Sequence, residues 1–400
     1  MLAAVIGGNL QGIEATYLGQ KAGWEVMVID KNPGVPASGF CDSFFQLDVT
    51  SEMDLMRVAR EVDIVIPALE NEDALTSLGR WADIEGIPYA FDSEAYSISS
   101  SKLRSNQLFL RLGIPTPRSW PKCGFPVVAK ANKGSGSEGV QILHDMDEVR
   151  CRIPGTAPSE DWVIQEFLPG PSYSLEVFGF SGQYEGLQVT DLAMDRSYDC
   201  KRVLAPTELT PGLAAEFEEM SLAIAEALEL RGVMDVEMIV NDGRPKVLEV
   251  DARLPSQTPT AVYWSTGLNI VEMLGELFMQ GSLDCVLPQR SEPQSSMKPP
   301  RGLIYEHILV SRNRLEVAGE HIMTRAGPLK IWRDFFGADE AISSYERGRD
   351  EWVATLIISG TDRHDAWDRR CQAIEEIRRR FGLDAYFDQS AADYPAGLMP

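Results

Sequence analysis

A chain of 400 residues is long enough for two or three domains, and clefts between them are then expected. Lys and Arg number 37 against 60 Asp and Glu, and the net charge of −23 disfavours a nucleic acid as partner because phosphodiester backbones would be repelled. Apolar runs stay well short of the ~20 residues that span a bilayer, and the six cysteines and four histidines are scattered, so we expect no membrane segment, no disulfide framework and no structural zinc.

The first 95 residues alternate short apolar segments with helical patterns, which predicts a parallel βαβ unit. The expected strands are residues 3–6, 25–29, 63–67 and 88–91, and the expected helices are residues 12–22, 52–61 and 71–85. The first turn carries Asn9 where a dinucleotide fingerprint needs glycine, although Asp30 stands where a ribose ligand would. We therefore favour a turn whose backbone N–H groups face another ligand over a nicotinamide site.

Longer strands around a glycine-rich loop follow. Helices are expected over residues 93–113, after Pro211 and over residues 268–280. Strands are expected at residues 126–130, 162–167, 173–180, 186–192, 233–240 and 246–254, and Asp242-Gly243 between the last two is a strong hairpin signal.

The last quarter of the chain begins with a proline-rich segment, residues 285–301, which predicts a linker. Strands at residues 303–310 and 352–359, a helix at residues 365–381 and a disordered tail near residues 391–395 are expected after it. We expect an N-terminal domain over residues 1–95, a central domain over 96–284 with a lid subdomain at about 120–190, and a C-terminal domain over 302–390.

The final strand of the hairpin carries acids at alternate positions. Glu249, Asp251 and Arg253 would face one way, because successive side chains of a strand point to opposite faces. The residues expected on the other face are Leu248, Val250, Ala252 and Leu254. Asp235 and Glu237 lie on the partner strand, where Glu237 would sit beside Glu249. Such acids repel one another unless a cation joins them, and oxygen ligands suit Mg²⁺ bound also by phosphates; a solvated edge hairpin is the plainer alternative.

Two further segments point weakly to a nucleotide. After the strand that ends at Lys130, Ser135 and Gly136 belong to a loop whose backbone N–H groups can surround phosphate oxygens, although such a loop is more often an ordinary flexible hairpin. The loop lacks the Gly-Lys-Ser/Thr of a Walker motif. The strand at residues 162–167 breaks at Pro169-Gly170, where exposed backbone groups can read an adenine edge.

The order of these parts resembles the ATP-grasp ligase superfamily over about residues 96–280. The resemblance implies an α/β and α+β protein with an N-terminal Rossmann-like parallel βαβ unit, a central two-lobed ATP-binding domain and a C-terminal α/β unit. It also implies that Lys102 and Lys130 contact ATP phosphates. The adenine would be held by Gln165, Glu166, Phe167 and Leu168.

For Mg²⁺, the resemblance implies Glu237 and Glu249 as ligands. The family usually has Asn where Asp251 stands, so Asp251 is expected to act as a further metal ligand. The acid usual for the ribose is replaced near Ser172, which leaves Glu176 as the candidate.

Within the superfamily, several segments look like the ligases of pyrrolysine biosynthesis, above all residues 251–260 and 304–307. That resemblance implies amide formation between 3-methyl-D-ornithine and the ε-amine of L-lysine, with ATP and Mg²⁺. Separately, an N-terminus with no basic segment and no apolar run of secretory length leads us to expect a cytoplasmic protein. A homodimer is left open.

The chemistry assigns the remaining candidates. Converting a carboxylate to an acyl phosphate needs charge neutralisation, for which Lys130 and Asp251 stand beside the metal, and Arg253 would stabilise the oxyanion formed on amine attack. The proton acceptor is not fixed by the sequence, and Asp235 is one option. The substrate pocket is expected to use Gln11, Glu70, Asn71, Asp199, Asp235 and Ser256, each of which has a turn or capping residue as its plainer alternative.

Three other readings remain open at this point. An ATP-grasp carboxylase or a ligase with a different amine keeps the fold and changes the acceptor. A nicotinamide-dependent oxidoreductase uses only the N-terminal unit and leaves the hairpin acids unexplained. A non-catalytic nucleotide sensor would need Arg253 to be dispensable.

Overall fold

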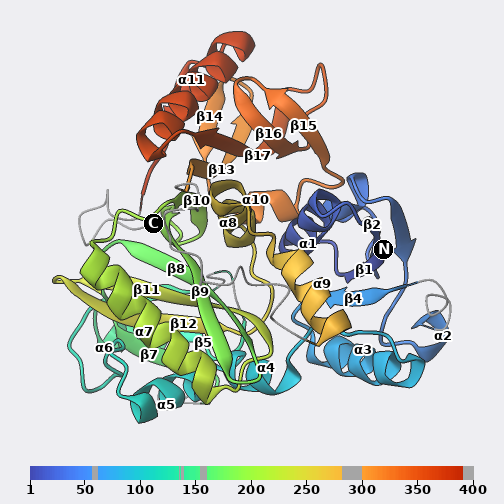
Figure 1. Cartoon of the computed structure of the whole chain (residues 1–400). Helices are drawn as coiled ribbons and strands as arrows, with labels where there is room; N and C mark the ends of the chain where they lie inside the picture. The colour runs from blue at the N-terminus through green and yellow to red at the C-terminus, as the bar shows by residue number, and fades with distance from the viewer. Residues whose placement is uncertain (56–61, 135, 137–138, 154–159, 282–299, 391–400) are drawn as a thin grey trace. The chain divides into compact units, whose positions relative to one another are not determined.

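The computed structural model describes residues 1–55, 62–134, 136, 139–153, 160–281 and 300–390 (Figure 1). The expected linker at residues 285–299 and the expected tail at residues 391–395 lie outside this part of the chain. Packing divides the chain into two compact units. The first comprises Met1–Phe91, Lys201–Pro206 and Leu254–Gln389, and the second comprises Asp92–Cys200, Thr207–Arg253 and Ser390. The boundaries of the three expected domains stay a prediction.

The first unit begins with a four-stranded parallel sheet in the order β3-β2-β1-β4. Its elements are β1 (Leu2–Ile6), α1 (Leu10–Lys21), β2 (Glu25–Asp30), η1 (Pro36–Gly39), β3 (Ser43–Gln46), α2 (Glu52–Leu55), β4 (Ile64–Pro67) and α3 (Glu72–Glu85). The apolar residues of β1, β2 and β4 are buried apart from Leu2, as a parallel sheet covered on both faces requires, whereas Phe45 of the edge strand β3 is exposed. The expected parallel unit is confirmed, but the expected strand at residues 88–91 is wrong, because only Tyr89 pairs there, with Val65.

The rest of the first unit is a sheet that is antiparallel apart from the parallel β14–β18 pair, with helices around it. Its strands pair in the order β10-β13-β17-β16-β15, and β14 joins β13 and β18. The strands are β10 (Cys200–Ala205), β13 (Gly302–Ser311), β14 (Arg314–Val317), β15 (Lys330–Phe335), β16 (Ala338–Ser343), β17 (Glu351–Gly360) and β18 (Ala385–Phe387). The helices are α8 (Thr258–Thr266), α9 (Ile270–Gln280), α10 (His321–Thr324) and α11 (Arg363–Phe381).

The second unit contains two antiparallel sheets, β12-β11-β8-β9 and β6-β5-β7. The strands are β5 (Val127–Ala131), β6 (Gln141–Leu143), β7 (Trp162–Glu166), β8 (Ser172–Phe180), β9 (Gln183–Met194), β11 (Gly232–Asn241) and β12 (Arg244–Asp251). The helices are α4 (Ser93–Ser99), α5 (Lys102–Leu112), α6 (Met146–Arg152) and α7 (Pro211–Ala227). A parallel N-terminal sheet combined with antiparallel sheets confirms the expected fold class.

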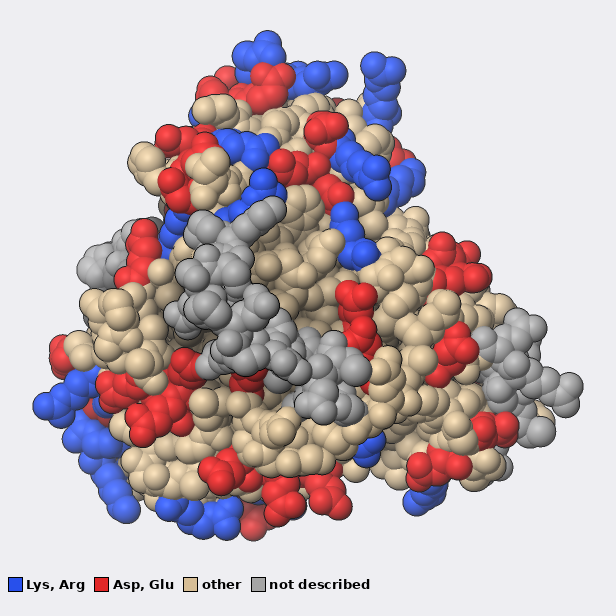
Figure 2. All heavy atoms as spheres, viewed as in Figure 1, with Lys and Arg blue, Asp and Glu red and all other residues tan. Residues whose placement is uncertain are grey.

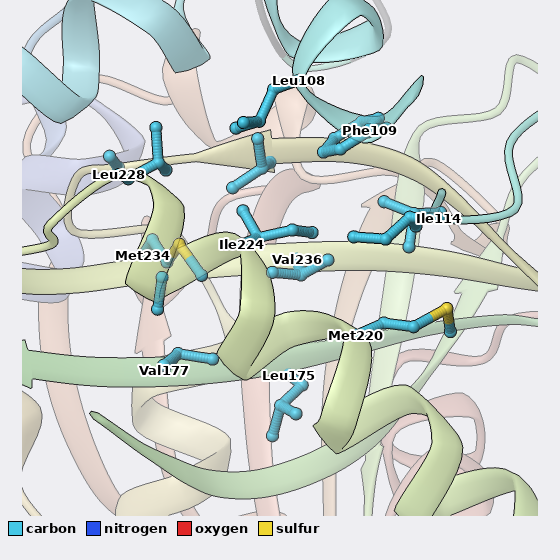
Figure 3. Packing of buried hydrophobic residues seen from close by; sticks show 14 of the residues in the cluster. Leu108, Phe109, Ile114, Leu175, Val177, Met220, Ile224, Leu228, Met234 and Val236 are labelled. Carbon is cyan, nitrogen blue, oxygen red and sulfur yellow. The ribbon is translucent and has the colours of Figure 1, made fainter. Parts of the chain in front are cut away.

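Helices α5 and α7 cover the core of the second unit (Figure 3). Phe217 and Ile224 of α7 are fully buried with Val177 and Val236 of the sheet, and Leu108 of α5 packs in the same cluster. Burial of these apolar side chains is the main stabilising term for the sheet that carries the acids.

The helix expected over residues 93–113 is broken at Ser100 and Ser101. The break has a tertiary cause, because Asn132, which follows β5, accepts the backbone N–H of Lys102 through its carbonyl oxygen at 3.0 Å and that of Leu103 through its side chain at 3.0 Å. Ser101 donates to the same side chain at 3.0 Å. A new helix therefore begins at Lys102, next to β5 and Lys130.

A β-bulge corrects the expected alternation on β12. Glu237 pairs with Glu249 whereas Met238 pairs with Val247, so Leu248 has no partner of its own on β11. Val247 joins the buried core in its place. The alternation predicted that Leu248 and Val250 share one face of the strand. In the structure, Val247 and Val250 belong to the core instead, and Leu248 does not.

Two leucines of α5 test the core assignment. Leu108→Ala is expected to cost about 2–5 kcal/mol, because it opens a cavity among buried neighbours. Leu110→Ala on the same helix is expected to cost about 0.5 kcal/mol or less, because that side chain is 69% exposed. Urea unfolding followed by circular dichroism measures both, and equal losses would contradict the packing of α5.

Candidate active site

The second unit contains a cavity of ≈ 390 Å³. Most of the residues expected around a nucleotide line it, namely Lys102, Lys130, Gly136, Gln165, Glu166, Phe167, Leu168, Glu237 and Glu249. They come from α5, the β5–β7 sheet and the β11–β12 hairpin, so segments far apart in sequence meet around one space. Ser135 lies outside the described residues.

Two lysines converge on one carboxylate at this cavity. Lys102 Nζ lies 2.7 Å from Glu249 Oε1, and Lys130 Nζ lies 3.4 Å from Glu249 Oε2. Lys102 also donates to the carbonyl oxygen of Gly134 in the glycine-rich loop, and Lys130 to that of Leu248 at 3.4 Å. Burial would raise the pKa of Glu249, but the two ammonium groups outweigh it and lower the pKa. The site therefore holds two ammonium groups that share one carboxylate, Glu249, and a phosphate group could take its place as their counter-ion.

The acids align across neighbouring strands. Glu237 is directly opposite Glu249, and Asp235 is opposite both Asp251 on β12 and Glu176 on β8. The expected placement of Glu237 beside Glu249 is confirmed. Burial raises the pKa of Asp235 well above its usual value, and the charges of Asp251 and Glu237 raise it further. One carboxylate oxygen of Asp235 is buried with no hydrogen-bond partner among the described residues.

These acids fit a metal that is shared with phosphate oxygens. Among the described residues, no three Asp, Glu, His or Cys side chains converge into a ready metal cage. Mg²⁺, however, is commonly held by one or two carboxylates together with phosphates and water. Paired carboxylates and a buried oxygen without a hydrogen bond therefore suit Mg²⁺ brought in with a nucleotide.

Arg253 follows the strand directly. Its Nη2 lies 2.7 Å from Asp251 Oδ2, and both side chains are largely buried. The ion pair gives the guanidinium a fixed position at the end of the acidic row. Neither residue belongs to the cavity lining within the described part of the chain.

The adenine candidates form one wall of the cavity. Gln165 is buried on β7, and the ring of Phe167 meets that of Tyr198 edge-on at 6.4 Å. The carboxylate of Glu166 lies 2.6 Å from Arg118 and 3.2 Å from Lys246. Hydrogen bonds from Arg118, aided by Lys246, lower the pKa of Glu166 to about 2. Its side chain therefore holds β7 in place and is committed to these cations.

Glu176, the candidate for the ribose, does not line the described cavity. It is fully buried in the middle of β8, where Ser174 Oγ lies 3.3 Å from one of its oxygens. It does not belong to the described cavity lining, whereas Ser172 of the same strand does. Side chains two residues apart share a face, but only the start of β8 reaches the cavity.

The amino-acid candidates are divided between the two units. In the first unit, Gln11 Nε2 donates to Glu70 Oε1 at 2.9 Å, whereas Asn71 caps α3 through Ala74. Ser256 also belongs to the first unit, where its carbonyl oxygen accepts from Thr258 at 2.8 Å. In the second unit, Asp199 joins a tight turn through Asp195. The alternative of a capping residue therefore holds for Asn71.

Other residues were missed by the sequence argument. Tyr198, Leu192 and Met194 line the cavity, and Asn132 fixes the start of α5. Tyr198 has a positive φ of 62°. In the sequence, the only feature that could have marked Tyr198 as a site residue is its position in a short turn between Asp195 and Asp199. Asp30, by contrast, accepts from Gly8 at 2.9 Å and Asn32 at 2.8 Å, so its carboxylate shapes its own turn.

The ion pairs of Glu166 predict a pH-dependent stability. Because folding lowers its pKa to about 2 from 4.5, the pairs stabilise the fold fully above about pH 4.5 and lose their effect as the pH falls towards 2. Glu166→Gln is expected to have a smaller free energy of unfolding than the wild type at pH 6. This difference in stability should narrow as the pH falls from about 4.5 towards 2. Urea unfolding at fixed pH measures it. When Arg118 is already replaced by alanine, Glu166→Gln should change the free energy of unfolding by less. A stability difference that does not depend on pH would contradict the role of the Glu166 ion pairs.

Comparison with known proteins agrees with this geometry. Residues 99–257 match the ATP-grasp domain. The chain is 34% identical to the 3-methyl-D-ornithine–L-lysine ligase of Methanosarcina mazei, over 95% of this chain and 96% of that enzyme. It is 29% identical to a D-alanine–D-alanine ligase of Bacillus anthracis over 54% of this chain and 77% of that enzyme.

A solved structure shares the fold. The biotin carboxylase domain of Hydrogenobacter thermophilus 2-oxoglutarate carboxylase, solved with ADP, its magnesium salt and bicarbonate, superposes with a TM-score of 0.67 at 16% identity. The match covers 93% of this chain and 89% of that one. In the described residues, we find no helix with the length and apolar character needed to cross a membrane. By its identity to the Methanosarcina enzyme along nearly the whole length, the chain belongs to the family of 3-methyl-D-ornithine–L-lysine ligases within the ATP-grasp ligases.

Proposed function

We propose that this chain is an ATP-dependent ligase of pyrrolysine biosynthesis that joins the carboxylate of 3-methyl-D-ornithine to the ε-amine of L-lysine. The observation that carries the proposal is the pair of lysines on Glu249, which line a cavity of nucleotide size together with it, in a chain that matches the Methanosarcina mazei ligase over 95% of its length. The product is an amide, and ATP leaves as ADP and phosphate.

The phosphates of ATP would bind at Lys102 and Lys130. Both ammonium groups lie within 3.4 Å of Glu249, and a triphosphate offers them stronger counter-charges. Gly136 and the neighbouring loop would supply backbone N–H donors to the same oxygens. The adenine would stack in the wall that contains Phe167 and Leu168, with hydrogen bonds to the backbone near Gln165.

Glu237, Glu249 and Asp251 would hold Mg²⁺. Bound there, Mg²⁺ would supply positive charge for the transferred phosphoryl group and its leaving oxygen. Glu249 would exchange the lysines for the ion, and Asp251 would keep Arg253 in position through their 2.7 Å ion pair. Asp235 is the adjacent acid with a free acceptor oxygen, which suits an amine or its departing proton.

The reaction needs two activations. A carboxylate resists amine attack, so transfer of the γ-phosphoryl group makes an acyl phosphate and ADP. The ε-amine of lysine, whose pKa in water is ~10.4, must lose a proton before attack. Arg253 would then stabilise the oxyanion of the tetrahedral intermediate until phosphate leaves.

Two diamino acids need acids for their ammonium groups and donors for their carboxylates. Glu70, whose Oε1 accepts a hydrogen bond from Gln11 at 2.9 Å, is the acid we assign to one ammonium group. Asn71, Asp199 and Ser256 complete the proposed substrate contacts. Of these, Asn71 can offer only its amide N–H₂, since its oxygen caps α3.

ADP release tests the reaction most simply. With ATP and Mg²⁺, release is expected only when L-lysine and 3-methyl-D-ornithine, or D-ornithine as its unmethylated analogue, are both present, and mass spectrometry should find the amide. A coupled pyruvate kinase assay measures the rate. ADP release could instead depend on bicarbonate, or on one of the amino acids together with a different amine. Either result would replace this proposal by another ATP-grasp reaction.

The oxyanion assignment predicts the effect of Arg253→Lys. The substitution keeps the charge but loses the planar fork that can contact Asp251 and the oxyanion together, so we expect kcat to fall about 100-fold with the KM for ATP little changed. Steady-state kinetics separate the two parameters. A variant with a full kcat would mean that Arg253 does not touch the reacting atoms.

The metal assignment predicts the effect of Glu249→Gln. The amide keeps the shape of the side chain but removes the charge that attracts Mg²⁺, so we expect turnover to fall about 100-fold or more and the Mg²⁺ requirement to rise. Glu94→Gln, an exposed substitution in the same unit, serves as the control and should keep the full rate. Equal rates in the two variants would remove Glu249 from the site.

A further inference from the structure

The first unit contains a second pocket, of ≈ 660 Å³, between the β15–β16 hairpin and α11. Three partly buried aromatic side chains, Trp332, Phe336 and Tyr345, form its walls. None of the described residues that line it also lines the cavity of the second unit. Its volume is within the ~300–1,000 Å³ usual for small-molecule sites.

The hairpin that builds the pocket adopts an unfavourable backbone conformation. Asp334 and Phe336 both have φ of 52°, next to Gly337 at 98°. Phe336 and Gly337 form the two-residue turn between β15 and β16, where a type I′ hairpin requires a positive φ at both positions, although a side chain as bulky as Phe rarely takes it. The conformation places the ring of Phe336 against Tyr345, with 5.8 Å between centroids, and beneath the guanidinium of Arg380 at 5.3 Å.

Positive charge at the pocket is not fully neutralised. Arg333 and Arg380 line it, and neither makes an ion pair with another residue in the described part of the chain. The other lining arginine, Arg369, is already bound to Asp339 at 2.9 Å. Lining acids are Asp334 and Glu376, and the latter is bound to Arg379 at 2.6 Å.

The surroundings of the pocket differ from the rest of the chain in charge. Residues 330–381 hold ten Lys and Arg against eleven Asp and Glu, although the whole chain carries −23. Lys and Arg side chains are prominent over α11 and β15–β17 in Figure 2. The indole N–H of Trp332 is also buried with no acceptor among the described residues.

We propose that this pocket binds a purine nucleotide as a second, non-substrate ligand. The base would stack on Phe336 and its aromatic neighbours, where stacking tolerates any purine, and the phosphates would bind Arg333 and Arg380. The Trp332 N–H offers a donor to the ring or the ribose. A ligand of this kind allows the level of spent nucleotide to act on the enzyme apart from the nucleotide that reacts.

Equilibrium dialysis of ADP against the full chain tests the proposal. We expect two ADP per chain, and in Lys102→Ala/Lys130→Ala the tighter site is lost while the second remains. Arg333→Ala/Arg380→Ala should weaken the second site at least tenfold without changing kcat or the KM for ATP. Arg347→Ala, an exposed arginine just after Tyr345 that does not line the pocket, is the matched control and should bind like the wild type.

Several results would overturn the second site. Binding of only one ADP per wild-type chain would overturn it. So would a second ADP that binds with unchanged affinity in Arg333→Ala/Arg380→Ala. Binding of a decameric oligoadenylate without ADP binding would make the pocket a contact for RNA instead. Phe336→Gly, which suits the positive φ and removes the ring, adds an independent check, because it should weaken ADP at this site with the chain still folded by circular dichroism.

Discussion

The carboxylate of Glu249 is shared by two largely buried lysines, and this contact determines how the site can work. A buried ammonium group without a counter-charge is costly, so Lys102 and Lys130 need an anion whether or not a nucleotide is bound. Glu249 meets that need at 2.7 and 3.4 Å. Under the proposed function, a triphosphate would replace Glu249 at the two lysines, and the same carboxylate would then be available to Mg²⁺.

The fold brings these groups together by two local devices. Asn132 holds the backbone at the start of α5 against the end of β5, which fixes Lys102 beside Lys130. The bulge at Leu248 lets Val247 enter the core while Glu249 still pairs with Glu237. Both devices belong to a unit whose sheet is covered by α7 and α5. The acids are therefore held by packed strands, which suits a site that must keep its geometry while its ligands change.

Much of this arrangement follows from local sequence rules. The Asp242-Gly243 turn sets the register that pairs Asn241 with Arg244 and Met238 with Val247, and the bulge at Leu248 then shifts it by one residue, so that Glu249 lies opposite Glu237. The features that escaped prediction depend on distant contacts. The helix break at Ser101 is caused by Asn132, the bulge at Leu248 has no glycine or proline to mark it, and the end of β8 that reaches the cavity is decided by how two sheets meet. Strand β10 and helix α8 were missed because their polar residues hide the apolar pattern.

The central claim is that Glu237 and Glu249 receive a divalent ion only together with a nucleotide. Electron paramagnetic resonance of Mn²⁺, which can replace Mg²⁺ at oxygen ligands, measures this directly in the presence and absence of ADP. We expect weak binding of Mn²⁺ alone, tight binding once ADP is added, and loss of the tight binding in Glu237→Gln and Glu249→Gln. Mn²⁺ that binds equally well without ADP, or that ignores both substitutions, would contradict the account.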